Sequence, residues 1–213
     1  MANSPLNRSY PQQRYDVLVI DPPWSYGGQA AAARTVRYAT QLAGHQYEVI
    51  GNSNGSEINR NTGAGVENIA ASFPAADCAN DKAALFLWTT NPKLPFAFDL
   101  MRLWGFEYKT TLTWLKVSKV GVPLTGGLGW FFRGATEHVL FGTRGSYAIP
   151  ANLRQPNYVF AERTGHSAKP QAFYDLVERC TPGQTRLDVF ARSERPNWDS
   201  WGDEITDLKG NKP

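Results

Sequence analysis

Runs of hydrophobic residues alternate with polar, proline-containing segments in the first half of this chain. Residues 15–20 form a β-branched run without helical periodicity, and it stops at the Asp-Pro-Pro segment 21–23. A second run covers 83–88 and ends at the Thr-Thr-Asn-Pro segment 89–92. Short apolar runs of this kind are typical of strands that are buried on both faces. The pattern therefore predicts two buried strands, each of which ends at a polar turn.

The second half of the chain adds helical periodicity. Apolar side chains at 173, 176, 177 and 180 fall at i, i+3, i+4 and i+7, which predicts a helix over 169–180. Weaker patterns predict helices over 66–73 and 92–104 and strands over 106–117, 136–143 and 186–191. Alternating strands and helices predict an α/β sheet with helices on both faces. Function then belongs at the carboxyl ends of the strands, which places Asp21 and the residues after Phe190 at the site.

One segment is too long to be a simple connection. Residues 27–65 contain seven glycines, the three arginines Arg34, Arg37 and Arg60, and only two acidic residues. Such a composition cannot build a core of its own and is typical of functional loops. We expect a single domain over 1–213 in which 27–65 is a target-recognition insertion. No dinucleotide fingerprint or phosphate-binding Gly-Lys-Ser/Thr motif occurs in the sequence.

The amino-acid composition further narrows the class of protein. The 213 residues are 42% hydrophobic and carry two cysteines and three histidines, which excludes a disordered chain and a disulfide scaffold. The cysteines and histidines lack zinc-ligand spacing, so we expect no metal. The sequence has no apolar stretch long enough for a membrane span and no signal segment, so we expect a cytoplasmic protein that does not bind membranes. The net charge of +3 is compatible with a polyanionic partner without requiring one.

The segment Asp21-Pro22-Pro23-Trp24 carries the clearest chemistry. Neither proline has an N–H group, so the strand must end there, and Pro23 holds Pro22 extended. The carboxylate and the Pro22 carbonyl are two acceptors beside a flat indole. This combination suits an exocyclic amine on a planar base, whose two N–H groups the acceptors would take. The alternative is a carboxylate that caps a turn while the prolines merely end a strand.

With this segment, the chain resembles the MT-A70 family of adenine-N6 methyltransferases over about residues 15–204. Further matching pieces are Glu137-His138-Val139-Leu140, His166-Ser167-Ala168-Lys169-Pro170, Leu187 to Arg192 and Trp198 to Gly202. The resemblance implies a Rossmann-like methyltransferase fold, S-adenosylmethionine as the donor and the N6 amine of adenine in DNA or RNA as the acceptor. The catalytic segment precedes the cofactor segment, which implies the permuted, β-type order of motifs with long loop insertions.

The resemblance also implies roles for residues near the donor. Asp188 would bind a ribose hydroxyl, with Phe190 and Arg192 beside it, although an Asp at a strand end is also a common cap. Lys169, with His166 and Ser167, precedes a helix and would hold the donor's carboxylate. A solvated lysine and a structural histidine are the alternatives. Asp203 and Glu204, after two tryptophans, would close over the adenosine, where the family often has an amide pair.

A base inside a duplex cannot reach such a pocket, so the target must be flipped out or single-stranded. Candidate phosphate contacts are Arg34, Arg37, Arg60, Lys116, Lys119 and Arg133, with solvated surface charges as the alternative. The small size and the lack of an RNA-binding extension favour DNA over RNA. The remaining alternative is a non-catalytic nucleic-acid-binding subunit of a methyltransferase complex. A monomer and a homodimer both remain open.

Overall fold

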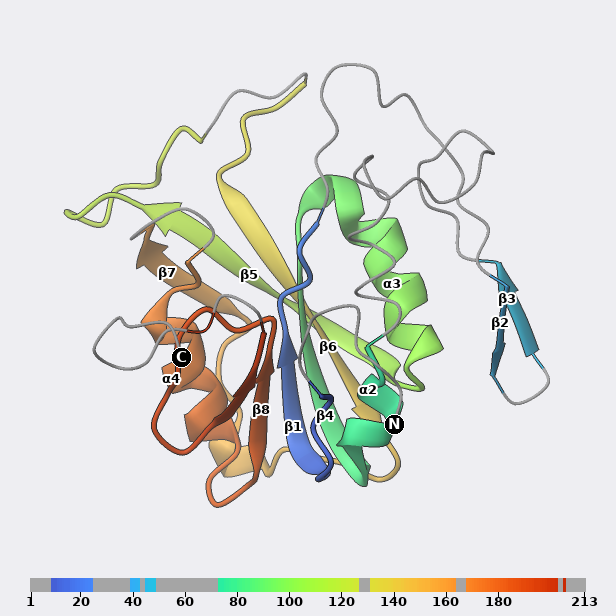
Figure 1. Ribbon diagram of the computed structural model, residues 1–213. Helices are drawn as coiled ribbons and strands as arrows, with labels where there is room; N and C mark the ends of the chain where they lie inside the picture. The colour runs from blue at the N-terminus through green and yellow to red at the C-terminus, as the bar shows by residue number, and fades with distance from the viewer. Residues whose placement is uncertain are drawn as a thin grey trace.

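A computed structural model describes residues 9–24, 39–42, 45–48, 73–126, 131–163, 168–202 and 205. The described residues form a seven-stranded sheet with helices on both of its faces and a separate two-stranded hairpin, β2 (Ala39–Leu42) and β3 (His45–Glu48) (Figure 1). The hairpin lies within the segment predicted to be a target-recognition insertion. None of the described helices is long and apolar enough to cross a membrane.

The large sheet has the strand order β7-β5-β6-β4-β1-β8-β9. Its strands are β1 (Tyr15–Ile20), β4 (Ala79–Thr89), β5 (Glu107–Val117), β6 (Thr136–Arg144), β7 (Tyr158–Glu162), β8 (Arg186–Val189) and β9 (Asp199–Trp201). Only β6 runs antiparallel to its neighbours, while the other six strands of this sheet point the same way. The amino end of β6 therefore lies at the same edge of the sheet as the carboxyl ends of the other strands.

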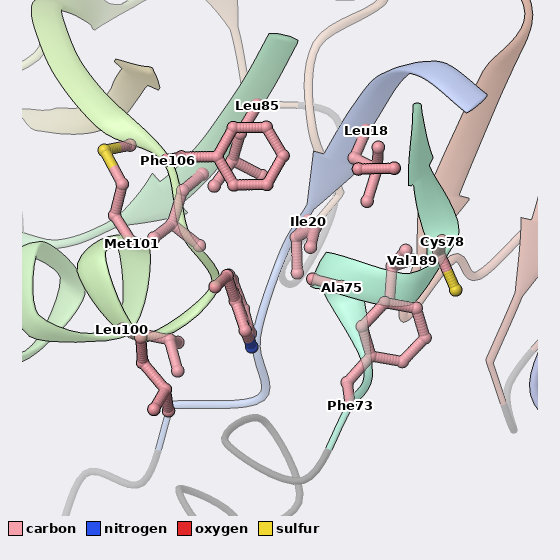
Figure 2. Packing of buried hydrophobic residues seen from close by; sticks show 14 of the residues in the cluster. Leu18, Ile20, Phe73, Ala75, Cys78, Leu85, Leu100, Met101, Phe106 and Val189 are labelled. Atoms are coloured by element: carbon pink, nitrogen blue, oxygen red, sulfur yellow. The ribbon is translucent and has the colours of Figure 1, made fainter. Parts of the chain in front are cut away.

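The two faces of the sheet bury separate cores, because successive side chains of a strand point to opposite faces. One face packs against α2 (Ala75–Cys78) and α3 (Leu94–Leu103), as Figure 2 shows for Leu18, Ile20 and Leu85 of the sheet and Leu100 and Met101 of α3. The other face packs against α4 (Gln171–Cys180). Its core is formed by Val17, Val19, Phe86, Trp88 and Val139 from the sheet and by Phe173, Leu176 and Val177 from the helix.

The α/β fold predicted from the sequence is confirmed, with shifts at element ends that have local causes. The helix predicted from residue 169 begins at Gln171, because Pro170 adopts an extended conformation as its N-cap. The helix predicted over 92–104 starts with a 3₁₀ turn, Asn91–Lys93, before α3. The strand predicted over 186–191 ends at Val189, because Phe190 has a φ of 60°, which breaks a strand.

Several short elements were not predicted, among them the strands β2 and β3 within the expected loop. The strands β7 and β9 and the single-turn helix α2 have three to five residues each, which is too few to show a period. A further 3₁₀ turn, Ala151–Leu153, precedes β7. Of the helix predicted over 66–73, only Phe73 lies within the described residues, and it forms a bend rather than a helical turn.

Candidate functional site

Three charged side chains meet at the edge where most strands of the sheet end. Asp21 directly follows β1, and its backbone N–H donates to the Val189 carbonyl of β8 at 3.3 Å. Glu137 is the second residue of β6, and only the reversed direction of β6 brings it to this edge. Lys169 lies two residues before α4. Segments that are far apart in the sequence thus converge on one point.

Lys169 lies between the two carboxylates. Its Nζ is 3.0 Å from Asp21 Oδ2 and 3.2 Å from Glu137 Oε2. The other oxygen of Glu137, Oε1, pairs with Lys116 Nζ at 2.7 Å. The side chains of Asp21, Glu137 and Lys169 are 18%, 17% and 9% exposed, so these charges interact with little screening by water. We call Asp21, Glu137 and Lys169 the acceptor-side cluster.

An aromatic wall supports this cluster from the α4 face. The ammonium of Lys169 lies 4.9 Å from the centroid of the Trp88 ring, within cation–π distance, and that of Lys116 lies 5.1 Å from the Trp114 ring. Trp88 and Trp114 pack edge to face with centroids 6.1 Å apart. The two lysines are therefore held by aromatic rings as well as by carboxylates.

Burial and charge act in opposite directions on these groups. Burial raises the pKa of Asp21, while the Lys169 ammonium opposes that rise and the Glu137 carboxylate adds to it. Burial alone would lower the pKa of Lys169, but Asp21 and Glu137 together raise it. Burial would raise the pKa of Glu137, but Lys169 and Lys116 together lower it. Lys169 thus stays protonated and Glu137 stays ionised.

The residues after Asp21 fix the direction of the chain. Pro22 is buried and Pro23 is exposed. The indole of Trp24 is half-buried, donates from Nε1 to the Trp88 carbonyl at 3.1 Å, and packs edge to face on Phe96 of α3 with centroids 5.7 Å apart. Trp24 is therefore anchored to β4 and α3. This anchoring holds the Asp-Pro-Pro segment at the end of β1.

A second cluster lies one strand away, at β8. Asp188 pairs with Val19 of β1 in the parallel ladder and is 3% exposed. Its Oδ2 accepts a hydrogen bond from the Tyr174 hydroxyl of α4 at 3.1 Å and lies 3.7 Å from Arg195 Nε. The Arg195 guanidinium also lies 3.3 Å from the centroid of the Tyr174 ring. We call Asp188, Tyr174 and Arg195 the donor-side cluster.

The charge of Asp188 is only partly balanced. Burial raises its pKa to about 7, Arg195 and the Tyr174 hydroxyl oppose the rise, and the nearby Asp21 carboxylate adds to it. Arg195 Nε and Ser200 Oγ are buried and find no hydrogen-bond partner among the described residues. Since buried polar atoms are normally paired, these two atoms indicate a place where a polar ligand or water binds.

The turn after β8 brings backbone close to this cluster. Phe190 has a φ of 60°, a conformation that non-glycine residues rarely adopt and that concentrates at functional sites. The next residue, Ala191, donates its N–H to the Trp201 carbonyl at 3.1 Å. A Cβ on Gly202 would lie 2.7 Å from the Ala191 oxygen, so only glycine allows this close approach.

The structure brings together several of the residues predicted from the sequence. Asp21, Pro22 and Lys169 meet at the acceptor-side cluster, and the exposed Arg192 is close enough to affect the pKa of Asp21. Lys116, a predicted phosphate contact, instead pairs with Glu137 and is largely buried. Lys119 and Arg133 are exposed on the connection between β5 and β6. Seven predicted residues lie outside the described ones: Arg34, Arg37, Arg60, His166, Ser167, Asp203 and Glu204.

Sequence reasoning missed three partners at the site. Glu137 was noted only as part of a matching motif, and its position at the start of a strand gave no sign of a charged role. Tyr174 and Arg195 were not singled out, since Tyr174 falls within the apolar stripe of α4 and Arg195 within a polar loop. The matching motif was the only sequence signal for Glu137. No comparable signal marked Tyr174 or Arg195.

The sequence is similar to that of known methyltransferases. The MT-A70 family matches residues 15–204 of the chain. The type II methyltransferase M.MunI from Mycoplasma sp is 29% identical over 211 residues, which cover 97% of this chain and 85% of the relative.

Two eukaryotic relatives match a shorter stretch. The N(6)-adenosine-methyltransferase MT-A70-like protein of Drosophila melanogaster is 30% identical over 61% of this chain, and the human N(6)-adenosine-methyltransferase catalytic subunit METTL3 is 29% identical over 59% of it. Each aligned stretch spans only 22% of the eukaryotic protein. All three relatives are named methyltransferases, which confirms the predicted enzyme class. Because the family match covers most of the chain, including every strand of the seven-stranded sheet, the chain belongs to the MT-A70 family.

Proposed function

We propose that this protein transfers a methyl group from S-adenosylmethionine to the N6 amine of adenine in DNA. The observation that carries the proposal is the acceptor-side cluster. In this cluster Asp21, the first residue of the Asp-Pro-Pro-Trp segment, has its carboxylate 3.0 Å from the largely buried Lys169 ammonium. This arrangement provides hydrogen-bond acceptors in a site with little water. Acceptors of this kind are what a weakly nucleophilic aryl amine requires.

The adenine amine is a poor nucleophile because its lone pair is delocalised into the ring. Lys169 binds Asp21 Oδ2, so Oδ1 is the oxygen that can accept one amine N–H, while the Pro22 carbonyl accepts the other. Two such bonds favour a pyramidal amine with a localised lone pair. They also stabilise the positive charge that develops on nitrogen as the N–C bond forms and the S–C bond breaks.

After transfer, the amine nitrogen carries an extra proton. The Asp21 carboxylate is the acceptor that lies beside it, and from there the proton can pass to solvent. Lys169 acts as a positioning residue because it fixes the Asp21 carboxylate. Glu137 in turn fixes Lys169 through a contact of 3.2 Å, and Lys116 holds Glu137 through a contact of 2.7 Å.

The donor-side cluster fits S-adenosylmethionine. Asp188 provides a carboxylate for a ribose hydroxyl, and Arg195 Nε and Ser200 Oγ are buried and make no hydrogen bond within the described residues. Phe190 and Arg192 extend the same strand end. When bound, the donor supplies the sulfonium methyl group that the amine attacks. The predicted donor contacts His166, Ser167, Asp203 and Glu204 remain predictions.

The comparisons favour DNA as the acceptor. A relative named as a type II methyltransferase, a class that modifies DNA, aligns with 97% of this chain. Relatives named N(6)-adenosine-methyltransferases align with only 59–61% of it. The exposed Lys119 and Arg133 are suited to phosphate contacts, and Arg34, Arg37 and Arg60 remain predicted ones.

Labelled methyl transfer to defined oligonucleotides tests the proposal. Single-stranded DNA, duplex DNA and RNA of matched sequence are incubated with the protein and labelled donor, and the product nucleoside is identified by mass. We expect N6-methyladenine in DNA. The same oligonucleotides with adenine replaced by purine, which lacks the amine, serve as the control. Donor binding without transfer to any of them would support the alternative of a non-catalytic subunit and overturn the proposal.

A further inference from the structure

Exposed hydrophobic side chains gather at one end of the sheet. On the edge strand β7, Tyr158 and Phe160 are 51% and 59% exposed. On the connection between β5 and β6, Phe131 and Phe132 are 92% and 89% exposed, and Val120, Val122 and Leu124 are exposed as well. Of the large exposed hydrophobic residues described, all except Tyr108 lie on these two neighbouring segments. Contiguous exposed apolar surface of this kind marks interaction sites.

Tyr158 and Phe160 form a pair of rings on one face of β7. Their centroids are 4.9 Å apart and their planes are inclined by 34°. Val159, between them, points to the other face and packs in the core against α4. Alternation along the strand therefore fixes both rings on the face opposite α4. We call Tyr158 and Phe160 the aromatic platform.

The platform lies at the same end of the sheet as the acceptor-side cluster, on the opposite face. Phe160 pairs with Leu115 of β5, and Leu115 pairs with Thr136, the residue before Glu137. The backbone of Phe160 is thus two strand spacings, about 10 Å, from that of β6. β7 also ends at the same edge of the sheet as β1 (Figure 1). β7 and β1 are four strand spacings, about 19 Å, apart, so a single strand that leaves a target base held at Asp21 crosses the edge of the sheet to reach the platform.

The charges around the platform are mainly positive. Lys119 and Arg133 are the only charged residues in the sequence between 118 and 135, and both are exposed. Arg163, directly after β7, is exposed too, and Glu162 is the one exposed carboxylate on this strand. A symmetric contact between two copies would bring these cations together, which disfavours self-association. A polyanion is favoured by the same charges.

We propose that the aromatic platform stacks the bases of single-stranded nucleotides that flank the methylated adenine. Exposed aromatic side chains beside cations are the usual means of holding single strands without reading their sequence, since every base has a flat face. The inference rests on the proposed function and extends it. It names single-stranded or locally opened DNA as the form that the protein holds.

Binding of a labelled oligonucleotide tests the platform. The probe is a fluorescein-labelled thymine tract with one central adenine, and its dissociation constant is measured by anisotropy over a range of salt. We expect Tyr158→Ala/Phe160→Ala to bind about 10–100-fold more weakly with an unchanged salt slope, because stacking is lost and no charge is removed. Tyr158→Phe/Phe160→Tyr keeps both rings and should bind like the parent. Tyr108→Ala, an exposed aromatic of β5 outside the platform, is the matched control.

Abasic probes separate stacking from general damage to the protein. Replacing the thymines on either side of the adenine by abasic sites should weaken binding to the parent. The same replacement should have little further effect on the double alanine variant, because the two changes remove the same contact. Equal losses in both proteins would overturn the proposal. So would an alanine variant that binds like the parent, or a parent dimer that the variant converts to monomer in sedimentation.

The outcomes also distinguish this inference from the proposed function. If the parent methylates adenine in DNA but the platform variants bind and react normally, the platform has no role and the function stands. If stacking is confirmed while no oligonucleotide is methylated, the proposed function fails and the binding surface stands.

Discussion

Two buried carboxylates lie on neighbouring strands at the same edge of the sheet, and their surroundings differ. Asp21, after β1, has a lysine ammonium at 3.0 Å that a second carboxylate also holds. Asp188, on β8, has a tyrosine hydroxyl at 3.1 Å and a guanidinium nitrogen at 3.7 Å. The first carboxylate has a cation at hydrogen-bond distance, whereas the second has a more distant cation and a neutral hydroxyl donor.

This difference suits two tasks. A carboxylate that accepts from a reacting amine must keep its position, and a lysine at 3.0 Å holds Asp21 and opposes the rise in pKa that burial causes. A carboxylate that binds neutral hydroxyl groups needs no close cation, and one would compete with the ligand for its oxygens. At Asp188, burial raises the pKa to about 7 against the opposing effects of Arg195 and the Tyr174 hydroxyl. The predictions below test this division between an acceptor side and a donor side.

The largest effect is expected at Asp21. Asp21→Asn keeps the size of the side chain but removes the charge that stabilises the reacting amine. Methyl transfer should fall about 10²–10³-fold or more, with donor affinity nearly unchanged. Single-turnover kinetics and calorimetry with the donor measure the two effects separately. Asp99→Asn on the surface of α3 is the control, and loss of donor binding in Asp21→Asn would contradict the separation into two sides.

Lys169→Met should cost the most stability. Removing the ammonium leaves the Asp21 carboxylate without its close cation and Glu137 with Lys116 alone, and breaking a buried ion pair typically costs about 3–5 kcal/mol. Adding Glu137→Gln should restore part of the free energy of unfolding, because it removes the negative charge that repels Asp21.

Urea unfolding of the parent, the two single variants Lys169→Met and Glu137→Gln, and the double variant gives the coupling free energy between the two positions. Lys109→Met removes a surface lysine paired with Glu107 at 2.6 Å and should change stability by less than about 1 kcal/mol. Additive effects at Lys169 and Glu137 would mean that the cluster does not act as a unit.

Asp188 should make stability depend on pH. Its pKa in the folded protein is about 7, above its ordinary value of 3.8, so the folded state retains a proton that the unfolded chain has released. The free energy of unfolding should therefore fall as pH rises from about 4 to 7 and then level off. Asp188→Asn removes this contribution. The difference in free energy of unfolding between parent and variant should therefore change by roughly 2–4 kcal/mol between pH 4 and 7.

Denaturant unfolding from pH 4 to 8 checks this trend. The direction is informative, because a carboxylate with a strong cation partner would gain stability as pH rises. A difference between parent and Asp188→Asn that is independent of pH would show that Asp188 is ionised throughout, like a paired carboxylate, and would remove the contrast with Asp21.

The smallest effects are expected outside both clusters. Lys119→Ala and Arg133→Ala should each reduce the slope of log affinity against log salt by about 0.7–0.9 for DNA, with donor affinity unchanged. Lys116→Ala should change it less, because Glu137 already holds that ammonium. Salt titrations of oligonucleotide binding measure these slopes. The same measurement applies to Arg34, Arg37 and Arg60.

Much of this description could be predicted from the sequence because its causes are local. The buried strand over 15–20, the proline stop after Asp21 and the stripe of α4 depend on residues close together in the chain. The Asp-Pro-Pro-Trp segment and Lys169 were recognised as site residues for the same reason, since neighbouring residues supplied the chemical context. The end of β8 at Val189 was missed because a φ of 60° at Phe190 depends on packing against Trp201, with ring centroids 5.5 Å apart.

The partners of these residues were decided only by the tertiary structure. Glu137 reaches Asp21 and Lys169 because one strand, β6, runs against the other six, and no local pattern encodes the direction of a strand in a sheet. Lys116 could be read as a phosphate contact from its sequence, but the same strand reversal gives it a carboxylate partner at 2.7 Å. Tyr174 and Arg195 join Asp188 across 14 and 7 positions of the chain, through a helix and a loop that pack on β8. Sequence thus determined which groups carry the chemistry, and the fold determined which charges those groups face, because electrostatic energy depends on distances in space.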